Sequence, residues 1–169
     1  MNTLITTVGL EDFFNGYKLS DGSIVNVRIM DTGGQEKFNA INQIFYKHAD
    51  CCLLVYDITC KKSFEVIKEY YVKKLKESCR NIIKVLLLGN KTDLNEKREI
   101  SLKDGADLAQ KNGYIFMESS CLDNYNVTDA FTTLIEMTNN ELIKTYNKNF
   151  RLKGEKNEKS KEKKKKKKC

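Results

Sequence analysis

The 169-residue sequence contains one histidine, no Cys-x-x-Cys pair and no apolar run of membrane-spanning length. The single histidine, His48, leaves little room for a histidine metal site or a histidine-dependent catalytic dyad. Six cysteines without regular spacing do not make the framework of a secreted, disulfide-bridged protein. The first residues also lack the charged-then-apolar pattern of a signal peptide. We therefore expect an intracellular protein with one packed domain and a tail.

Net charge is nearly absent from the first 150 residues and concentrated in the last 19. The chain carries +7, and residues 151–169 contain 11 Lys or Arg and three Glu, so they carry +8 and leave −1 for the rest. A nucleic-acid-binding domain normally has a basic surface on the domain itself, so this distribution argues against one. It indicates an electrostatic arm joined to an almost neutral domain.

Apolar patterning predicts alternating strands and helices. Strands are predicted at residues 10–20, 23–30, 51–56, 82–88 and 114–117. Helices are predicted at residues 35–49, 63–77, 102–112 and 126–147. The turn signal Asp21-Gly22 joins the first two strands into a hairpin that delivers Asp31 at its end. The alternation as a whole predicts a three-layer, doubly wound and mostly parallel α/β sheet.

Two of the predicted helices carry more detailed expectations. Ser101 and Asp104 are spaced as an N-terminal cap for the helix at 102–112, and Gly113 is placed to close it. The final helix is expected to turn one apolar face inward, made of Val127, Ala130, Phe131, Leu134, Ile135 and Leu142.

Polar or glycine-containing strings follow three of the predicted strands. They are Asp31-Thr32-Gly33-Gly34-Gln35, Gly89-Asn90-Lys91-Thr92-Asp93 and Glu118-Ser119-Ser120-Cys121. Ligands of parallel α/β sheets bind at the carboxyl ends of the strands, so these loops are expected to converge on one edge. Taken singly, each string is also typical of strand-end caps and turns. In this order, each after a strand, the set indicates a guanine-nucleotide site.

The residue types suit recognition of the base. Guanine presents two donors, N1–H and its exocyclic amine, which the carboxylate of Asp93 can accept together and which adenine lacks. Asn90 would brace the loop, and the stem of Lys91 would lie over the base. Backbone N–H groups around Ser120 and Cys121 would reach the guanine carbonyl oxygen.

The first string suits the phosphate end of a nucleotide. Asp31 can hold Mg²⁺ through a water, because a hard cation prefers anionic oxygen. Gly34 lets a backbone N–H approach the γ-phosphate without an intervening side chain. Gln35 can orient an attacking water, because its amide both donates and accepts hydrogen bonds.

The strings at 31–36 and 90–93 resemble the γ-phosphate/Mg²⁺ box and the guanine-recognition box of Ras-like small GTPases. Thr7-Val8-Gly9-Leu10-Glu11 is similar to a switch string of the Rab branch, and residues 53–59 also resemble that branch. The resemblance implies a GTP/GDP- and Mg²⁺-dependent GTPase that switches vesicle traffic, with Gln35 catalytic and Thr7 joining Asp31 at the metal. It also implies a monomer that meets effectors and regulators on the cytoplasmic face of an intracellular membrane, with a cytosolic pool.

The string G-x-x-x-x-G-K-[ST] occurs nowhere in the chain. The resemblance implies that the first strand, the phosphate-binding loop and the first helix are missing, so nothing cradles the α- and β-phosphates. Two inner strand edges would also lose their shared neighbour. We therefore expect residues 1–147 to be a partial GTPase domain that is poorly stable and binds GTP weakly. An active GTPase with an incomplete sequence and a non-hydrolysing protein that engages Rab partners both remain open.

Residues 148–169 are expected to form a disordered, polybasic, membrane-targeting tail. Six consecutive lysines, Lys163–Lys168, precede Cys169, and each adds about 1 kcal/mol of attraction near an anionic leaflet. A prenyl group on Cys169 would complete a two-signal anchor. The alternatives are a solvated charge run with an unmodified cysteine, and a basic arm that contacts RNA or acts as a nuclear signal.

Overall fold

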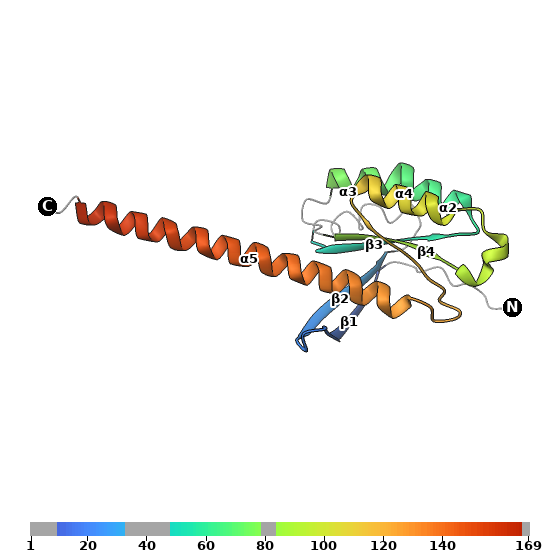
Figure 1. Cartoon of the computed structure of the whole chain (residues 1–169), viewed down its shortest axis with the longest axis horizontal. Coiled ribbons are helices and arrows are strands. Elements are labelled where there is room, and N and C mark those ends of the chain that lie inside the picture. The colour runs from blue at the N-terminus through green and yellow to red at the C-terminus, as the bar shows by residue number, and fades with distance from the viewer. Residues whose placement is uncertain (1–9, 33–47, 79–83, 167–169) are drawn as a thin grey trace.

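The computed structural model describes residues 10–32, 48–78 and 84–166, and the side chains of residues 13–31, 48–77 and 84–148. In this part of the chain the strands form two sheets (Figure 1). The hairpin sheet consists of β1 (Leu10–Lys18) and β2 (Ile24–Thr32). The parallel sheet has the order β3-β4-β5, with β3 at Cys51–Asp57, β4 at Lys84–Asn90 and β5 at Ile115–Glu118. The helix predicted at residues 35–49 lies outside the described residues, except for its last two positions, which are not helical.

The hairpin sheet is antiparallel, with Leu10 opposite Thr32 and Lys18 opposite Ile24. Its turn contains Gly22 at a φ of 86°, in the left-handed region that glycine adopts at low cost. Along β2, half-buried Val25, Val27 and Ile29 alternate with exposed Asn26 and Arg28. The predicted hairpin is thus confirmed.

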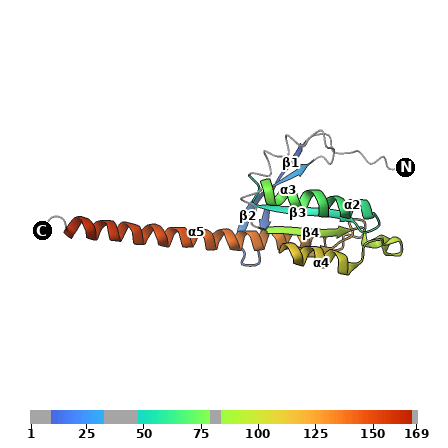
Figure 2. The same ribbon diagram turned by 90° about the horizontal axis from the view of Figure 1, so that it is seen from above.

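Strand β4 is the centre of the parallel sheet and of the hydrophobic core. Residues 85–89 are all buried, because β4 has a strand on each side and helices over both faces (Figures 1 and 2). One face carries Tyr56, Val85 and Leu87 and packs against Phe64 and Ile67 of the helices that follow β3. Helices on both faces of a parallel sheet give the predicted three-layer arrangement.

The helices over the first face begin with three consecutive segments: α2 (Lys61–Val66), the π-helix η2 (Ile67–Tyr71) and α3 (Val72–Ser78). One continuous helix at 63–77 was expected, and its middle turn is a π-helix instead. Helix α4 (Leu102–Asn112) lies beside them and has the predicted ends. Ser101 Oγ accepts the Asp104 N–H at 3.1 Å, and the Asp104 carboxylate accepts the Ser101 N–H at 3.2 Å. Gly113 closes α4 with a φ of 70°.

Helix α5 (Val127–Lys166) covers the other face of the parallel sheet (Figure 1). Ala130 and Leu134 pack against Leu86 and Leu88 of β4, as predicted. Leu142, predicted to face inward, is 39% exposed. The helix runs past the edge of the sheet, so an apolar side chain this far along has no layer to pack against.

The structure continues α5 as helix to Lys166, where a disordered tail from residue 148 was expected. The reason is local: residues 148–166 contain no proline, and lysine and glutamate both favour helices. Glu155 and Lys159 are four residues apart, as are Glu162 and Lys166, a spacing that suits opposite charges on a helix. Of the helices in the described residues, none is long and apolar enough to cross a membrane.

In the described residues the two sheets share no strand, and a hydrogen bond joins the hairpin turn to α5. Here β2 pairs with β1, and β3 pairs with β4. The Ser20 N–H, in the hairpin turn, donates to Glu136 Oε1 of α5 at 2.8 Å. Leu19 beside it is buried.

Candidate functional site

The loops after β4 and β5 lie side by side at the carboxyl edge of the parallel sheet. β4 ends at Asn90 and β5 at Glu118, and the two strands are neighbours. Backbone hydrogen bonds join the loops: the Ser119 N–H donates to Gly89 O at 2.8 Å, and the Thr92 N–H donates to Ser119 O at 3.1 Å. We call these two loops, with Asp57 at the end of β3, the strand-end site.

Asn90 links β4 to the loop after β5. Its Oδ1 accepts hydrogen bonds from Ser119 Oγ and from the Cys121 N–H, both at 3.3 Å. The Ser120 N–H donates to Tyr125 O at 3.1 Å. Both amides expected to reach a base carbonyl are therefore hydrogen-bonded within the chain, the Cys121 amide through the longer bond.

The carboxylate of Asp93 is oriented by a buried hydroxyl. Ser120 Oγ donates to Asp93 Oδ1 at 2.7 Å, and the same Oγ accepts the Asp123 N–H at 3.1 Å. Ser120 is fully buried, so the hydroxyl has little freedom to turn away. Asp93 itself is only half-buried, at the start of a short 3₁₀ segment, η3 (Thr92–Lys97). The carboxylate of Asp93 is therefore held as a hydrogen-bond acceptor at the carboxyl edge of the parallel sheet.

Lys91 has an unusual backbone and a fixed ammonium group. Its φ of 71° lies in the left-handed region, where a residue other than glycine is uncommon. Its Nζ is 2.7 Å from Asp57 Oδ2. The other oxygen of Asp57 accepts the Thr59 N–H at 2.8 Å and the Thr59 hydroxyl at 2.7 Å. Asp57 therefore holds the far end of the Lys91 side chain in place.

This contact shifts the pKa values of both groups. Burial by itself would raise the pKa of Asp57, but the hydrogen bonds from Lys91 and Thr59 outweigh it and leave the pKa below its ordinary 3.8. The hydrogen bond to Asp57 raises the pKa of Lys91 above its ordinary 10.5. Both groups are accordingly charged over the whole physiological pH range.

Sequence reasoning missed Asp57 as a member of the site. The signal was present, since Asp57 directly follows the apolar run 51–56, just as the three selected strings follow their strands. Asp57 is the single acidic residue of the Rab-like string 53–59, and the sequence gives no indication of its partner. Only the pairing of β3 with β4, which places Asp57 beside Asn90, brings its carboxylate to Lys91.

A second ion pair, between Arg98 and Glu118, links the segment after Asp93 to the end of β5. Arg98, just after η3, donates from Nη1 to Glu118 Oε1 at 2.7 Å and from Nη2 to Glu118 Oε2 at 2.9 Å. Its Nε donates to Asn95 Oδ1 at 2.8 Å. Only 21% of the Arg98 side chain and 11% of the Glu118 side chain are exposed. This two-pronged contact ties the segment after Asp93 to the end of β5.

Of the remaining predicted site residues, the structure describes only Asp31. Asp31 is exposed near the end of β2, in the hairpin sheet. Thr7, Gly34, Gln35 and Cys169 lie outside the described residues. The structure thus brings together the five residues predicted to meet the base, Asn90, Lys91, Asp93, Ser120 and Cys121.

Loops gathered at the carboxyl edge of a parallel sheet, with an oriented carboxylate among them, are typical of nucleotide-binding α/β proteins. A protein-family model described as the Ras family matches residues 1–140 of this chain. The chain therefore belongs to the Ras family.

Curated proteins similar to this chain include Rab proteins. Ras-related protein Rab-8A of Gallus gallus is 40% identical over 132 residues, which cover 78% of this chain and 63% of the relative. Ras-related protein Rab-8 of Diplobatis ommata is 37% identical over 147 residues, covering 87% of this chain and 69% of the relative. Rab-8A of Bos taurus is 39% identical over 133 residues. The chain spans 63% of the length of the first and third of these relatives.

Proposed function

We propose that this chain carries the base-recognition half of the nucleotide site of a Rab-like small GTPase, a GTP-binding and GTP-hydrolysing switch in vesicle trafficking. The observation that carries the proposal is the Asp93 carboxylate, fixed by the buried Ser120 hydroxyl at 2.7 Å beside Asn90 and Lys91. The Ras family match and the similarity to Rab-8 proteins support it.

In this proposal Asp93 accepts N1–H and the exocyclic amine of guanine. Lys91 lays its aliphatic stem along the base, which is possible because Asp57 holds its ammonium group to one side. The guanine carbonyl oxygen takes the Cys121 N–H, replacing the 3.3 Å bond to Asn90, the longer of the two amide bonds at this turn. Adenine offers Asp93 no matching pair of donors, so the site selects guanine.

The residues proposed to act at the phosphate end of the site all lie within the first 35 residues of the chain. Thr7 and Asp31 are the proposed Mg²⁺ ligands, and their oxygen atoms suit a hard cation. Gly34 would admit a backbone N–H to the γ-phosphate, and Gln35 would orient the attacking water. The bound metal would neutralise charge on the phosphate oxygens.

The basic C-terminal region is proposed to direct the protein to a membrane. Residues 148–169 include the lysine run that ends at Lys168, followed by Cys169 as the candidate prenylation site. One lipid chain together with a polybasic patch makes a stable anchor. The protein would act on the cytoplasmic face of an intracellular membrane, where it meets Rab effectors and regulators.

Titration with nucleosides tests the base site without any requirement for phosphate contacts. We expect guanosine, added to the ¹⁵N-labelled chain, to shift the amide signals of residues 90–93 and 119–121, and adenosine to leave them unchanged. Asp93→Asn is the matched variant: it replaces an acceptor with a donor, so guanosine should lose its effect and xanthosine, with a carbonyl in place of the amine, should gain one. Equal shifts with guanosine and adenosine, or none with either, would contradict the proposal.

A further inference from the structure

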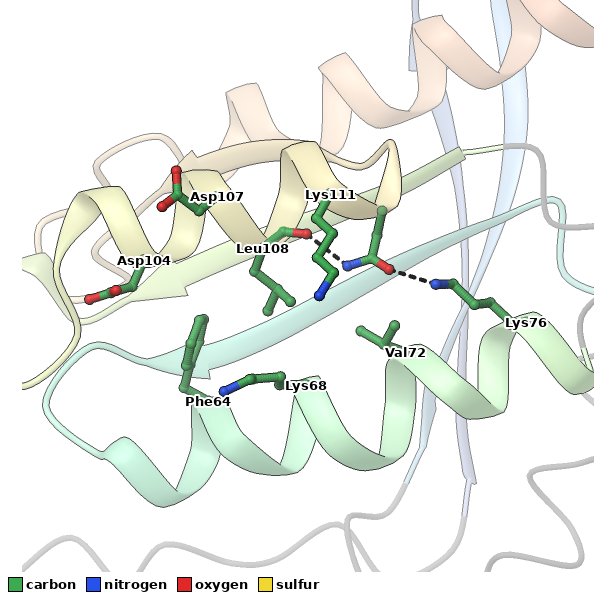
Figure 3. A pocket seen from close by; sticks show the side chains of 9 residues that line it. Phe64, Lys68, Val72, Lys76, Asp104, Asp107, Leu108 and Lys111 are labelled. Atoms are coloured by element: carbon green, nitrogen blue, oxygen red, sulfur yellow. Dashed lines mark hydrogen bonds between the residues drawn. The ribbon is translucent and has the colours of Figure 1, made fainter.

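A groove lies between two helical walls on the face of the parallel sheet opposite α5. One wall is the continuous segment α2–η2–α3, and the other is α4 (Figure 3). Its volume is about 370 Å³. Phe64, Val72 and Leu108 contribute apolar surface, and no residue of the strand-end site lines it. The groove is therefore a separate feature from the proposed nucleotide site.

The π-helix in the first wall keeps that wall aligned with the groove. Four lining residues follow one another at intervals of four: Phe64, Lys68, Val72 and Lys76. An α-helix has about 3.6 residues per turn, so each step of four would carry the next side chain further around the helix. In η2 the backbone hydrogen bonds join residues five positions apart, so the turn contains more residues than an α-helical turn. The rotation between residues four apart is then smaller, which offsets part of the displacement around the helix. All four side chains thus face α4, and π turns of this kind are frequent at functional sites.

The acidic residues on the groove's rim have partners on their own helix. Asp104 is held by the Ser101 cap. Asp107 pairs with Lys103, and Figure 3 shows its carboxylate pointing away from the space between the helices. Both carboxylates lie toward the N-terminal end of α4, away from the end of the groove at Lys76 and Lys111 (Figure 3).

Of the three lysines on the rim, only Lys68 has a carboxylate partner within the described residues. Lys68 lies 3.4 Å from Glu65 on its own helix. Lys76 Nζ donates to the neutral amide oxygen of Asn112 at 2.8 Å. Lys111 extends from α4 toward the opposite wall (Figure 3), and the structure gives it no carboxylate partner within the described residues. The end of the groove at Lys76 and Lys111 therefore carries positive charge above an apolar floor.

We propose that this groove docks an acidic peptide segment of a partner protein. An apolar side chain of the segment would fill the space over Phe64, Val72 and Leu108, while flanking carboxylates pair with Lys76 and Lys111. Both walls are helices whose backbone groups are bonded internally, so the partner is recognised through side chains. The chain's own tail is excluded as the occupant, because residues 151–169 carry +8 and the lysines of the groove would repel it.

Selection of short random peptides displayed on phage, against the full 169-residue chain, tests the proposal. We expect the enriched peptides to carry Asp or Glu next to Leu, Ile or Phe, and to shift the amide signals of Leu108 and Lys111. The double variant Lys76→Glu/Lys111→Glu should weaken their binding at least about tenfold. The milder Lys76→Gln/Lys111→Gln should weaken it less, and added salt should weaken binding to the unmodified chain.

The matched control reverses two exposed lysines outside the groove. Lys73 on α3 and Lys144 on α5 each have an exposed side chain and an acidic neighbour on the same helix. Lys73→Glu/Lys144→Glu changes the net charge by the same amount and should leave peptide binding unchanged. Equal loss in both double variants, enriched peptides without the acidic and apolar pattern, shifts mapped elsewhere, or no enrichment at all would overturn the proposal. So would binding to anionic lipid vesicles that depends on Lys76 and Lys111 while peptide binding does not, because the face would then be a membrane contact.

Discussion

The hairpin sheet and the parallel sheet both contain apolar residues along their strands, but the surroundings of those residues are opposite. In the parallel sheet, residues 85–89 of β4 are all buried. In the hairpin sheet, Phe14 is 74% exposed and Ile24 71% exposed. Among residues 13–31 only Leu19, in the turn region next to α5, is buried. Strand formation and burial are thus separate outcomes within one chain.

The difference shows what each depends on. A hairpin forms where alternation and a turn signal allow two adjacent segments to pair, which is a local event. Burial needs layers from distant parts of the chain, here α2–η2–α3 and α4 on one face of the parallel sheet and α5 on the other. A two-stranded sheet without such layers is marginal in water. The stability of the described residues should therefore reside mainly in the parallel sheet.

The strongest test of this contrast truncates one apolar side chain in each sheet. Leu87 of β4 is fully buried, so Leu87→Ala should lower the free energy of unfolding by about 3 kcal/mol. Phe14→Ala in the hairpin sheet should change it by less than about 0.5 kcal/mol, because the ring is mostly in water already. Urea unfolding followed by far-ultraviolet circular dichroism measures both. Similar losses in the two variants would remove the contrast.

A glycine substitution probes how tightly the helices press on the parallel sheet. A Cβ at Gly105 of α4 would lie 2.5 Å from the Tyr56 hydroxyl oxygen and 2.6 Å from the Phe116 ring. Alanine gains about 1 kcal/mol over glycine in a helix, while overpacking a core costs about 1–3 kcal/mol, so Gly105→Ala should be destabilising by about 1 kcal/mol.

The matched control is Gly16→Ala in β1, where the nearest atom to the new Cβ is Ile24 Cγ2 at 3.4 Å. This variant should be neutral or slightly stabilising. Thermal unfolding of the two variants compares them. A stabilised Gly105→Ala variant would show that α4 packs less closely on the parallel sheet than these distances indicate.

The hairpin turn should respond locally. Gly22 has a φ of 86° and open space around it, so Gly22→Ala causes no clash. The left-handed backbone should nevertheless lower the free energy of unfolding by about 1 kcal/mol, because alanine is unfavourable in this conformation. We expect faster amide hydrogen exchange in β1 and β2 with unchanged exchange in β4. Exchange that accelerates equally in both sheets would mean that they open together.

The smallest expected effect belongs to Asp57 at the end of β3. Asp57→Asn removes the ion pair with Lys91, whose side chain is 49% exposed, so the loss should stay below about 1 kcal/mol. The folded-state pKa of Asp57 lies below 3.8, so its stabilisation is present above that pH and disappears as the pH falls through the folded-state value.

Unfolding midpoints measured across pH check this sign. The difference in unfolding midpoint between the unmodified chain and Asp57→Asn should be constant near neutral pH and should disappear in acid below pH 3.8. Because the folded-state pKa of Lys91 is raised, the stabilisation from its charge is lost only as the pH rises above 10.5, outside the range of this experiment. A gap that stays constant into strong acid would mean that the carboxylate contributes no charge interaction.

Predictions from sequence succeeded where the cause is a few neighbouring residues. The Asp21-Gly22 turn and the Ser101–Asp104 cap are examples, because their hydrogen bonds join residues two or three positions apart. The middle of the helix at 63–77 was predicted incorrectly, because one π turn changes the apolar spacing too little to be distinguished from an α turn in the sequence. The length of α5 was also underestimated, because a run rich in lysine suggests solvation whether or not it is helical.

The sequence by itself determined the order of strands and helices, the strings that follow them and the basic C-terminal region, because periodicity, turn residues and charge are local properties. The tertiary structure alone decided that Asp57 meets Lys91, that Ser120 orients Asp93 and that Arg98 braces Glu118. Each of these contacts joins residues 20 or more positions apart. Such contacts follow from which strands become neighbours, and that choice is made by burial of both sheet faces and not by any single segment.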